Sequence, residues 1–193
     1  MKRILTVIMF VAVTAVAAQA QEFKQFRVGL GAGYAMASGE GAQAGVLIFL
    51  EPAYRVSDQI LAGLRIEGAA IVRGYDVTVE TGSASASFGG SYALFGQYYF
   101  NNNTFRPFVG AGVGLSKVST AAASFGGEAF AALNESKFGF FPRVGFDAGH
   151  FSISIDYNLV GASTLTGTSG TELKTKNNYI GIRLGGFFGG GKK

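Results

Sequence analysis

The feature that most constrains this chain is a strict alternation of apolar residues with small or charged ones. Near the start, Val28, Leu30 and Tyr34 alternate with Gly29 and Gly31, and the same pattern recurs along most of the sequence. Successive side chains of a β-strand point to opposite faces, so a period of two predicts strands. After residue 20 the sequence lacks the i, i+3, i+4, i+7 apolar spacing of an amphipathic helix. The chain is therefore predicted to be all-β.

Eight segments carry the alternation: 26–36, 46–55, 62–73, 88–100, 105–116, 138–147, 151–159 and 179–188. Their lengths suit a tilted membrane crossing of about 9–11 residues. Three connections are short and rich in turn-forming residues, namely Ser57–Gln59, Asn101–Thr104 and Gly149–His150. They alternate with longer segments at 37–44, 74–86, 118–136 and 161–177. An even number of strands with short turns at one end and long loops at the other predicts an antiparallel up-and-down transmembrane β-barrel.

The two faces of the predicted strands differ in chemistry. One face is apolar and is expected to meet lipid; it includes Val28, Leu30, Ile48, Leu50, Leu64, Ile66, Leu94, Val113, Val144, Ile153, Ile155, Ile182 and Leu184. The opposite face carries every arginine that follows residue 20, together with acidic residues and many glycines. A soluble antiparallel sheet would bury its apolar face and expose its charges. An apolar outside around a polar inside favours an outer-membrane barrel.

The inward charges are expected to plug the barrel, because eight strands enclose a space just wide enough for side chains to fill. We expect a lumenal ion-pair network of Arg27, Glu51, Arg65, Glu67, Arg106, Arg143, Asp147, Asp156 and Arg183. A two-residue turn at Gly149–His150 would place Arg143 opposite Asp156, and a three-residue turn at Ser57–Gln59 would place Glu51 opposite Arg65. A gated polar pore is the alternative, and its surplus of arginines would favour anions.

The glycine-rich stretches 28–34 and 109–115 are not phosphate-binding loops, because their glycines are spaced by two and no helical segment follows. They are expected to leave room in the lumen for Arg27, Arg106 and the large side chains opposite. Three prolines conflict with a closed sheet, since each lacks an N–H for the ladder. We expect Pro107 to lie near a strand start and Pro142 to mark a bulge, and the sequence leaves the register near Pro52, Pro107 and Pro142 open.

The first twenty residues are predicted to be a signal peptide. Lys2 and Arg3 precede an apolar run, and Ala18 and Ala20 form a small-x-small motif, so cleavage is expected before Gln21. This gives a signal peptide at 1–20 and a barrel domain at 21–193. A retained membrane anchor is the alternative, but the apolar run is short for a spanning helix.

Other chemistry receives little support. Removing Lys2 and Arg3 from the 16 basic residues leaves 14 against 12 acidic ones, which gives no reason to expect a nucleic-acid partner. The absence of cysteine excludes disulfides, Cys-based zinc sites and thiol nucleophiles. The single histidine, His150, lies in a predicted turn without a serine or cysteine partner, which argues against a triad or a histidine metal site. We therefore expect no catalytic residue, metal or cofactor.

The segments "FRPFVGAGVGL" and "YIGIRLGGFF", with the signal peptide, resemble the outer-membrane β-barrel domain family of Gram-negative bacteria, the small "porin family" barrels of the OmpA, OmpX and OmpW type. The resemblance implies an outer-membrane location and insertion by the barrel insertion machinery with periplasmic chaperones. The even strand count places both termini on the short-turn, periplasmic side. A non-enzymatic structural role, or contact with an unidentified surface partner through the extracellular loops, is the first expectation. The OmpW-like branch implies a narrow channel for small or hydrophobic solutes as the alternative, and an envelope enzyme is the third.

Overall fold

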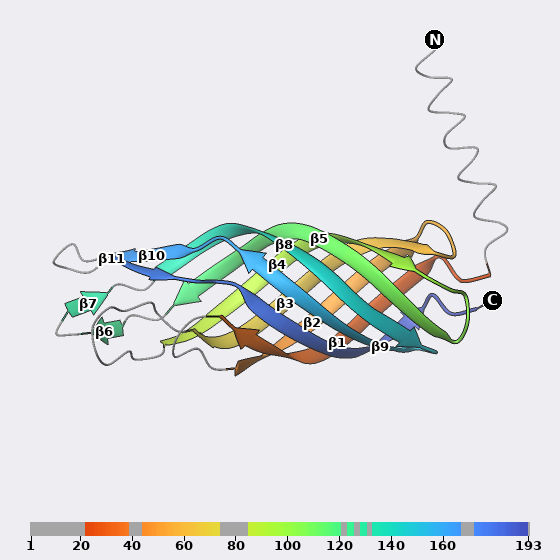
Figure 1. Cartoon of the computed structure of the whole chain (residues 1–193), viewed down its shortest axis with the longest axis horizontal. Helices are drawn as coiled ribbons and strands as arrows, with labels where there is room; N and C mark the ends of the chain where they lie inside the picture. The colour runs from red at the N-terminus through yellow and green to blue at the C-terminus, as the bar shows by residue number, and fades with distance from the viewer. Residues whose placement is uncertain are drawn as a thin grey trace, which may run out of the picture.

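The computed structural model is a closed antiparallel barrel of eight strands. The structure describes residues 22–38, 44–73, 85–120, 123–125, 128–130, 133–166 and 172–192. The barrel strands are β1 (Phe26–Ala37), β2 (Ala44–Arg55), β3 (Ile60–Arg73), β4 (Ser85–Tyr99), β5 (Phe105–Thr120), β8 (Leu133–Ala148), β9 (Phe151–Val160) and β12 (Tyr179–Gly189). Each strand pairs with its neighbours in the order β1-β12-β9-β8-β5-β4-β3-β2, and the strands cross the barrel obliquely (Figure 1). The eight-stranded up-and-down barrel predicted from the alternation is confirmed.

Two further hairpins extend beyond one end of the barrel, here called the loop end (Figure 1). They consist of β6 (Ala123–Phe125) with β7 (Glu128–Phe130), and of β10 (Ser163–Thr166) with β11 (Glu172–Thr175). Both lie in segments expected to be long loops. The Asn177 side chain fixes the start of the second hairpin, donating to the Gly161 carbonyl at 2.6 Å and to Ser163 Oγ at 2.9 Å.

Several sequence expectations lie outside the described residues. These are the signal peptide 1–20 with its cleavage residues Ala18, Ala20 and Gln21, and most of the predicted loops 37–44 and 74–86. No helix in the described part of the chain is long and apolar enough to cross a membrane.

The opposite end, here called the turn end, carries the three predicted tight turns. Tyr99 and Phe105 flank the turn of residues 100–104. In this turn the backbone N–H of Asn103 donates to Asn101 Oδ1 at 3.1 Å. Gly149 begins the two-residue turn with a φ of +61°, a conformation that glycine adopts without a steric penalty. The first and last described segments meet here too, because Phe23 and Lys192 form an antiparallel bridge.

The prolines interrupt hydrogen bonding without shifting the strands. Between β2 and β3, Leu50 pairs with Ile66 and Ala53 pairs with Gly63, so the register is the same on both sides of Pro52. The same holds around Pro142, where Phe140 pairs with Leu159 and Arg143 with Asp156. The expected bulge at Pro142 is therefore wrong: a missing N–H removes a rung of the ladder, but no extra residue is inserted. Pro107 lies near the start of β5, as expected.

Several inward glycines leave room for large side chains across the lumen, as expected, and the side chains at these positions are aromatic rings. A Cβ at Gly112 would lie 2.6 Å from Cε1 of Phe141, and one at Gly31 would lie 2.8 Å from Cζ of Phe49. Gly145 would similarly meet the ring of Phe108, at 2.7 Å. A Cβ at each of the three positions would also come too close to a backbone carbonyl of a neighbouring strand. Because real Cβ atoms do not approach so closely, these positions are small both for the neighbouring backbone and for the aromatic side chains that cross the lumen.

Two groups of aromatic residues border the apolar outward face. The turn-end girdle comprises the exposed side chains of Phe26, Tyr54, Tyr98, Phe100, Phe105, Phe151 and Phe188. The loop-end girdle comprises Tyr34, Tyr92, Phe138 and Tyr157. Aromatic rings at both membrane interfaces, with an apolar band between them, are typical of transmembrane barrels.

Candidate functional site

The interior of the barrel is filled by charged and aromatic side chains. Ten charged residues that the sequence predicted to face the lumen are at most 6% exposed. Arg55 and Arg106 are two of them, and the other eight are Arg27, Glu51, Arg65, Glu67, Arg143, Asp147, Asp156 and Arg183. These eight come from six strands, β1, β2, β3, β8, β9 and β12, whose alternation turns one residue in two inward. The side chain of Arg73 lies outside the described part.

The central group of the lumen is a continuous chain of ion pairs. Glu51 Oε1 accepts hydrogen bonds from Arg65 Nε and from Arg143 Nη1, each at 3.0 Å. Asp156 Oδ2 lies 2.5 Å from Arg65 Nη2 and 2.6 Å from Arg183 Nη1, and Asp156 Oδ1 lies 3.6 Å from Arg143 Nε. A single carboxylate therefore faces three guanidinium groups. In the register, Arg143 pairs with Asp156 as predicted, and Glu51 reaches Arg65 as the three-residue turn required.

This central network continues toward the loop end through Arg183 and Glu67. Arg183 Nε and Nη2 both donate to Glu67 Oε2, at 2.9 and 2.5 Å, and the Tyr179 hydroxyl donates to Glu67 Oε1 at 2.6 Å. The network then contains three arginines and three carboxylates, so its charges balance. Balance matters because an unpaired charge in a dry interior costs several kcal/mol (about 3–5 when one partner of a buried pair is removed).

A second, separate ion pair lies closer to the turn end. Arg27 Nη1 contacts Asp147 Oδ2 directly, and the Tyr99 hydroxyl donates to the same oxygen at 2.7 Å. The Arg27 guanidinium also lies over the ring of Phe187, 3.7 Å from its centroid. This pair is balanced as well.

Arg106 does not belong to the ion-pair network, contrary to the sequence prediction. It faces Asp147 across β5 and β8, but its guanidinium turns toward the turn end. There Nε donates to the Asn101 carbonyl at 3.1 Å, and Nη2 donates to the Asp58 carbonyl and to Asn102 Oδ1. The carboxylate of Asp147 is already occupied by Arg27 and Tyr99, and the carbonyls of the short turns offer Arg106 closer acceptors.

Arg55 shares this environment, so the surplus of positive charge lies at the turn end. Its Nη1 donates to the Asp58 carbonyl at 3.1 Å and its Nη2 to the Gly190 carbonyl at 3.4 Å. The ring of Phe23 closes this end of the lumen beneath both arginines. Its centroid lies 3.9 Å from Arg106 Cζ and 4.9 Å from Arg55 Cζ. Phe23 is itself only 5% exposed.

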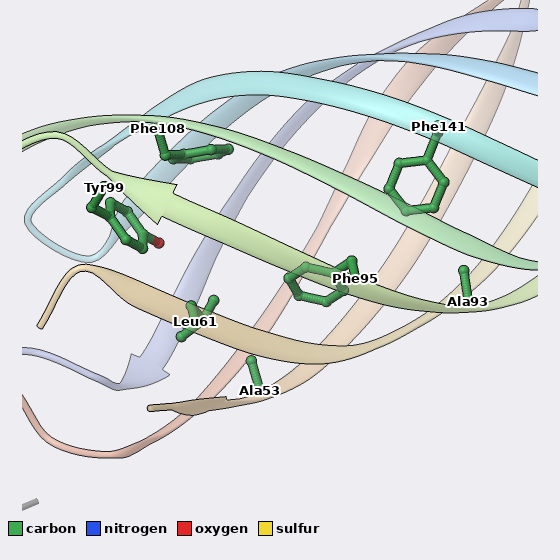
Figure 2. Packing of buried hydrophobic residues seen from close by; sticks show 7 residues of the cluster. All are labelled: Ala53, Leu61, Ala93, Phe95, Tyr99, Phe108 and Phe141. Atoms are coloured by element: carbon green, nitrogen blue, oxygen red, sulfur yellow. The ribbon is translucent and has the colours of Figure 1, made fainter. Parts of the chain in front are cut away.

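An aromatic cluster packs between these charges. Figure 2 shows Phe95 and Tyr99 of β4, Phe108 of β5 and Phe141 of β8 directed into the barrel beside Leu61. Tyr99 and Phe108 meet edge to face at 5.4 Å, and Arg65 Cζ lies 3.8 Å from the centroid of Phe141. Rings stacked on guanidinium groups exclude water from the ion pairs while still stabilising the cations.

Near the loop end the lumen is filled by a second apolar cluster of Ala35, Leu47, Ile71, Val160 and Tyr179. Two cavities of about 20 Å³ lie beside the network, one lined in part by Arg65 and Asn158, the other by Glu67 and Tyr179. Each has room for about one water molecule. The arrangement is that of a packed interior.

The side chains expected to face lipid are at least 39% exposed, with one exception. Ile153 is half-buried, although its neighbour Ile155 is exposed. It lies between Phe146 on one neighbouring strand and Leu184 on the other, two large apolar side chains.

The lumenal network predicted from the sequence did not include Tyr99, Tyr179 or Phe141, although all three line the interior. All three fall on the inward face by the same alternation that located the charges, and that parity was the available signal. His150, by contrast, lies in its predicted turn, exposed, with its ring 5.3 Å from that of Phe187.

A known protein family matches the sequence of this barrel. The model of the family described as "Outer membrane protein beta-barrel domain" matches residues 5–188. The chain belongs to this family. It is an outer-membrane β-barrel of the small type, and the resemblance found in the sequence is confirmed.

The solved structures that share its fold include two outer-membrane barrels. The outer membrane protein OprG from Pseudomonas aeruginosa is 15% identical, with 89% of this chain and 99% of that chain covered at a TM-score of 0.59. Neisserial surface protein A is 18% identical, with 84% and 94% covered at a TM-score of 0.51. At these identities the likeness concerns the fold alone. No curated protein is similar enough in sequence to count as a relative.

Proposed function

We propose that the protein is a plugged, non-conducting barrel of a Gram-negative outer membrane. Its role would be structural, or would depend on contacts made at its loop end, and not on transport or catalysis. The observation that carries the proposal is the lumen itself. Eight charged side chains, each at most 6% exposed, form two charge-balanced groups with aromatic rings packed between them. A conducting pore would need hydrated charges along a continuous path.

The orientation follows from the two ends of the barrel. Transmembrane barrels have short periplasmic turns and longer extracellular loops, so the turn end and both chain termini would face the periplasm. The two extra hairpins would then stand on the cell surface, where a partner would meet them. Biogenesis would use the barrel insertion machinery and periplasmic chaperones, with outer-membrane lipid as the surrounding partner.

Single-channel recording tests the proposal. Purified, refolded protein in a planar bilayer is expected to give no discrete openings, because no hydrated path crosses the packed lumen. A variant with serine at Glu51, Arg65, Arg143 and Asp156 removes two positive and two negative charges together and leaves the pair of Arg183 with Glu67 in place. This variant is expected to conduct.

Discrete openings of the unaltered protein would contradict the plugged barrel and support a narrow channel for small or hydrophobic solutes. The serine variant serves as the control that the bilayer assay detects an open lumen of this diameter.

A further inference from the structure

A hollow of about 520 Å³ interrupts the outward face near the loop end. Its centre is one rung of the sheet that runs across four strands, from Ile48 of β2 through Gly68 of β3 and Gly90 of β4 to Lys117 of β5. Ile48 forms one wall and the aliphatic part of the Lys117 side chain forms the other, with Gly68 and Gly90 between them.

Packing within the barrel does not require these two glycines. A Cβ at Gly68 would come no closer than 3.7 Å to Ile48 Cγ1, and a Cβ at Gly90 no closer than 3.7 Å to the Glu67 carbonyl. Both are ordinary contacts, in contrast to inward glycines such as Gly31, Gly112 and Gly145, where a Cβ would collide with backbone atoms or an aromatic ring. The missing side chains therefore open a hollow toward the lipid, and an unfilled hollow loses dispersion contacts.

Lys117 gives the hollow one charged edge. Its side chain is exposed, and none of the ion pairs among the described residues includes it. It lies two residues beyond Leu115, whose cross-strand neighbours Tyr92 and Phe138 belong to the loop-end girdle. A lysine just beyond an aromatic girdle lies at the depth of lipid headgroups, where its ammonium group remains solvated while its stem covers apolar surface.

We propose that this hollow binds one molecule of a phosphate-bearing membrane lipid. The phosphate would contact the ammonium group of Lys117, and an acyl chain would lie along Gly68 and Gly90 against Ile48. This goes beyond the proposed function, because it requires neither a closed lumen nor a partner at the loops. Because the loop end would face the cell exterior in the orientation proposed above, the lipid we assign to the hollow is a phosphorylated glycolipid of the lipid A type. An anionic glycerophospholipid, which shares this chemistry, is an outcome of the test.

A second hollow, of about 720 Å³, supplies a matched control. It lies nearer the turn end over the small residues Ala62, Gly96 and Ala111, and no charged side chain lines it. A Cβ at Gly96 would come no closer than 4.0 Å to another residue, so this glycine also tolerates a side chain.

Native mass spectrometry of the refolded protein in detergent micelles tests the proposal. Lipid A, phosphatidylglycerol and phosphatidylcholine are titrated separately. We expect one anionic lipid to be retained per barrel, and phosphatidylcholine to be retained much less. Lys117→Gln is expected to weaken anionic-lipid binding by about fivefold, as for one basic residue at a charged surface. Gly90→Leu fills the hollow and is expected to abolish retention.

Gly96→Leu, in the uncharged hollow, and Lys192→Gln, at the turn end, are expected to bind like the unaltered protein. Gly68→Leu serves as a second filling variant, and the heat-dependent shift of the folded band on gels shows which variants have folded. Binding of lipid A, alone or together with phosphatidylglycerol, supports the proposal, whereas binding of phosphatidylglycerol alone would overturn the assignment to lipid A. Equal retention of phosphatidylcholine, or Lys117→Gln and Gly90→Leu behaving like their controls, would overturn it. So would a mass corresponding to a dimer that Gly90→Leu alone dissociates, because a second copy would then occupy the hollow.

Discussion

Replacement of Asp156 with asparagine is expected to lower the free energy of unfolding by about 3–5 kcal/mol, the cost of removing one partner from a buried ion pair. Asp156 is fully buried and faces Arg65, Arg143 and Arg183. The variant leaves three buried guanidinium groups with only Glu51 and Glu67 to neutralise them. Unfolding by urea in lipid vesicles, followed by circular dichroism, measures the change.

Two further variants show whether the effect comes from charge balance. Glu135→Gln breaks the half-exposed pair with Lys137, and we expect it to cost less than about 1 kcal/mol. Asp156→Asn combined with Arg143→Gln restores balance, since Glu51 keeps Arg65 and Glu67 keeps Arg183. The double variant should recover part of the loss. An Asp156→Asn barrel as stable as the Glu135→Gln barrel would show that the lumenal charges are hydrated.

The second large effect is expected on the outward face. Leu94 is 63% exposed and belongs to an unbroken apolar row with Leu64, Val113 and Phe140 on the neighbouring strands. Leu94→Arg is expected to destabilise the barrel by about 2–4 kcal/mol, because the guanidinium group would enter the hydrocarbon region. The same urea titration in vesicles measures it.

Leu94→Ala separates the loss of apolar contact from the burial of charge, and Asn103→Arg places the same charge in an exposed turn. Both controls should change stability much less than Leu94→Arg. If arginine at position 94 is tolerated as well as arginine at position 103, the outward face does not meet lipid.

The strands, their faces and two cross-strand charge pairs could be predicted from the sequence, because a period of two and the length of a turn leave few registers open. Arg143 lies opposite Asp156 for this reason. Parity gives the face of a residue but not the direction of a long side chain. Arg106 has the predicted face, and yet its guanidinium reaches back to the carbonyls of Asn101 and Asp58.

The alternation in the sequence also could not predict the contacts between side chains across the lumen. Gly112 opposes Phe141 in the ladder, but its need to be small depends on where the far end of the ring lies. Phe23 precedes the first strand, and only the folded chain shows that its ring closes the turn end. The hairpins β6–β7 and β10–β11 are three or four residues per strand, too short for a periodic pattern to be recognised.

Thiol labelling most directly tests whether the lumen is closed, and the chain suits it because it contains no cysteine. Ala93→Cys and Ser154→Cys place small thiols at inward positions that are 6% and 2% exposed, while Asn103→Cys places one in an exposed turn. The barrel is reconstituted in vesicles and treated with a charged, water-soluble methanethiosulfonate reagent. A packed lumen predicts that both inward thiols react far more slowly than the thiol at position 103. Labelling of all three at similar rates would show a water-filled lumen and contradict the plugged barrel.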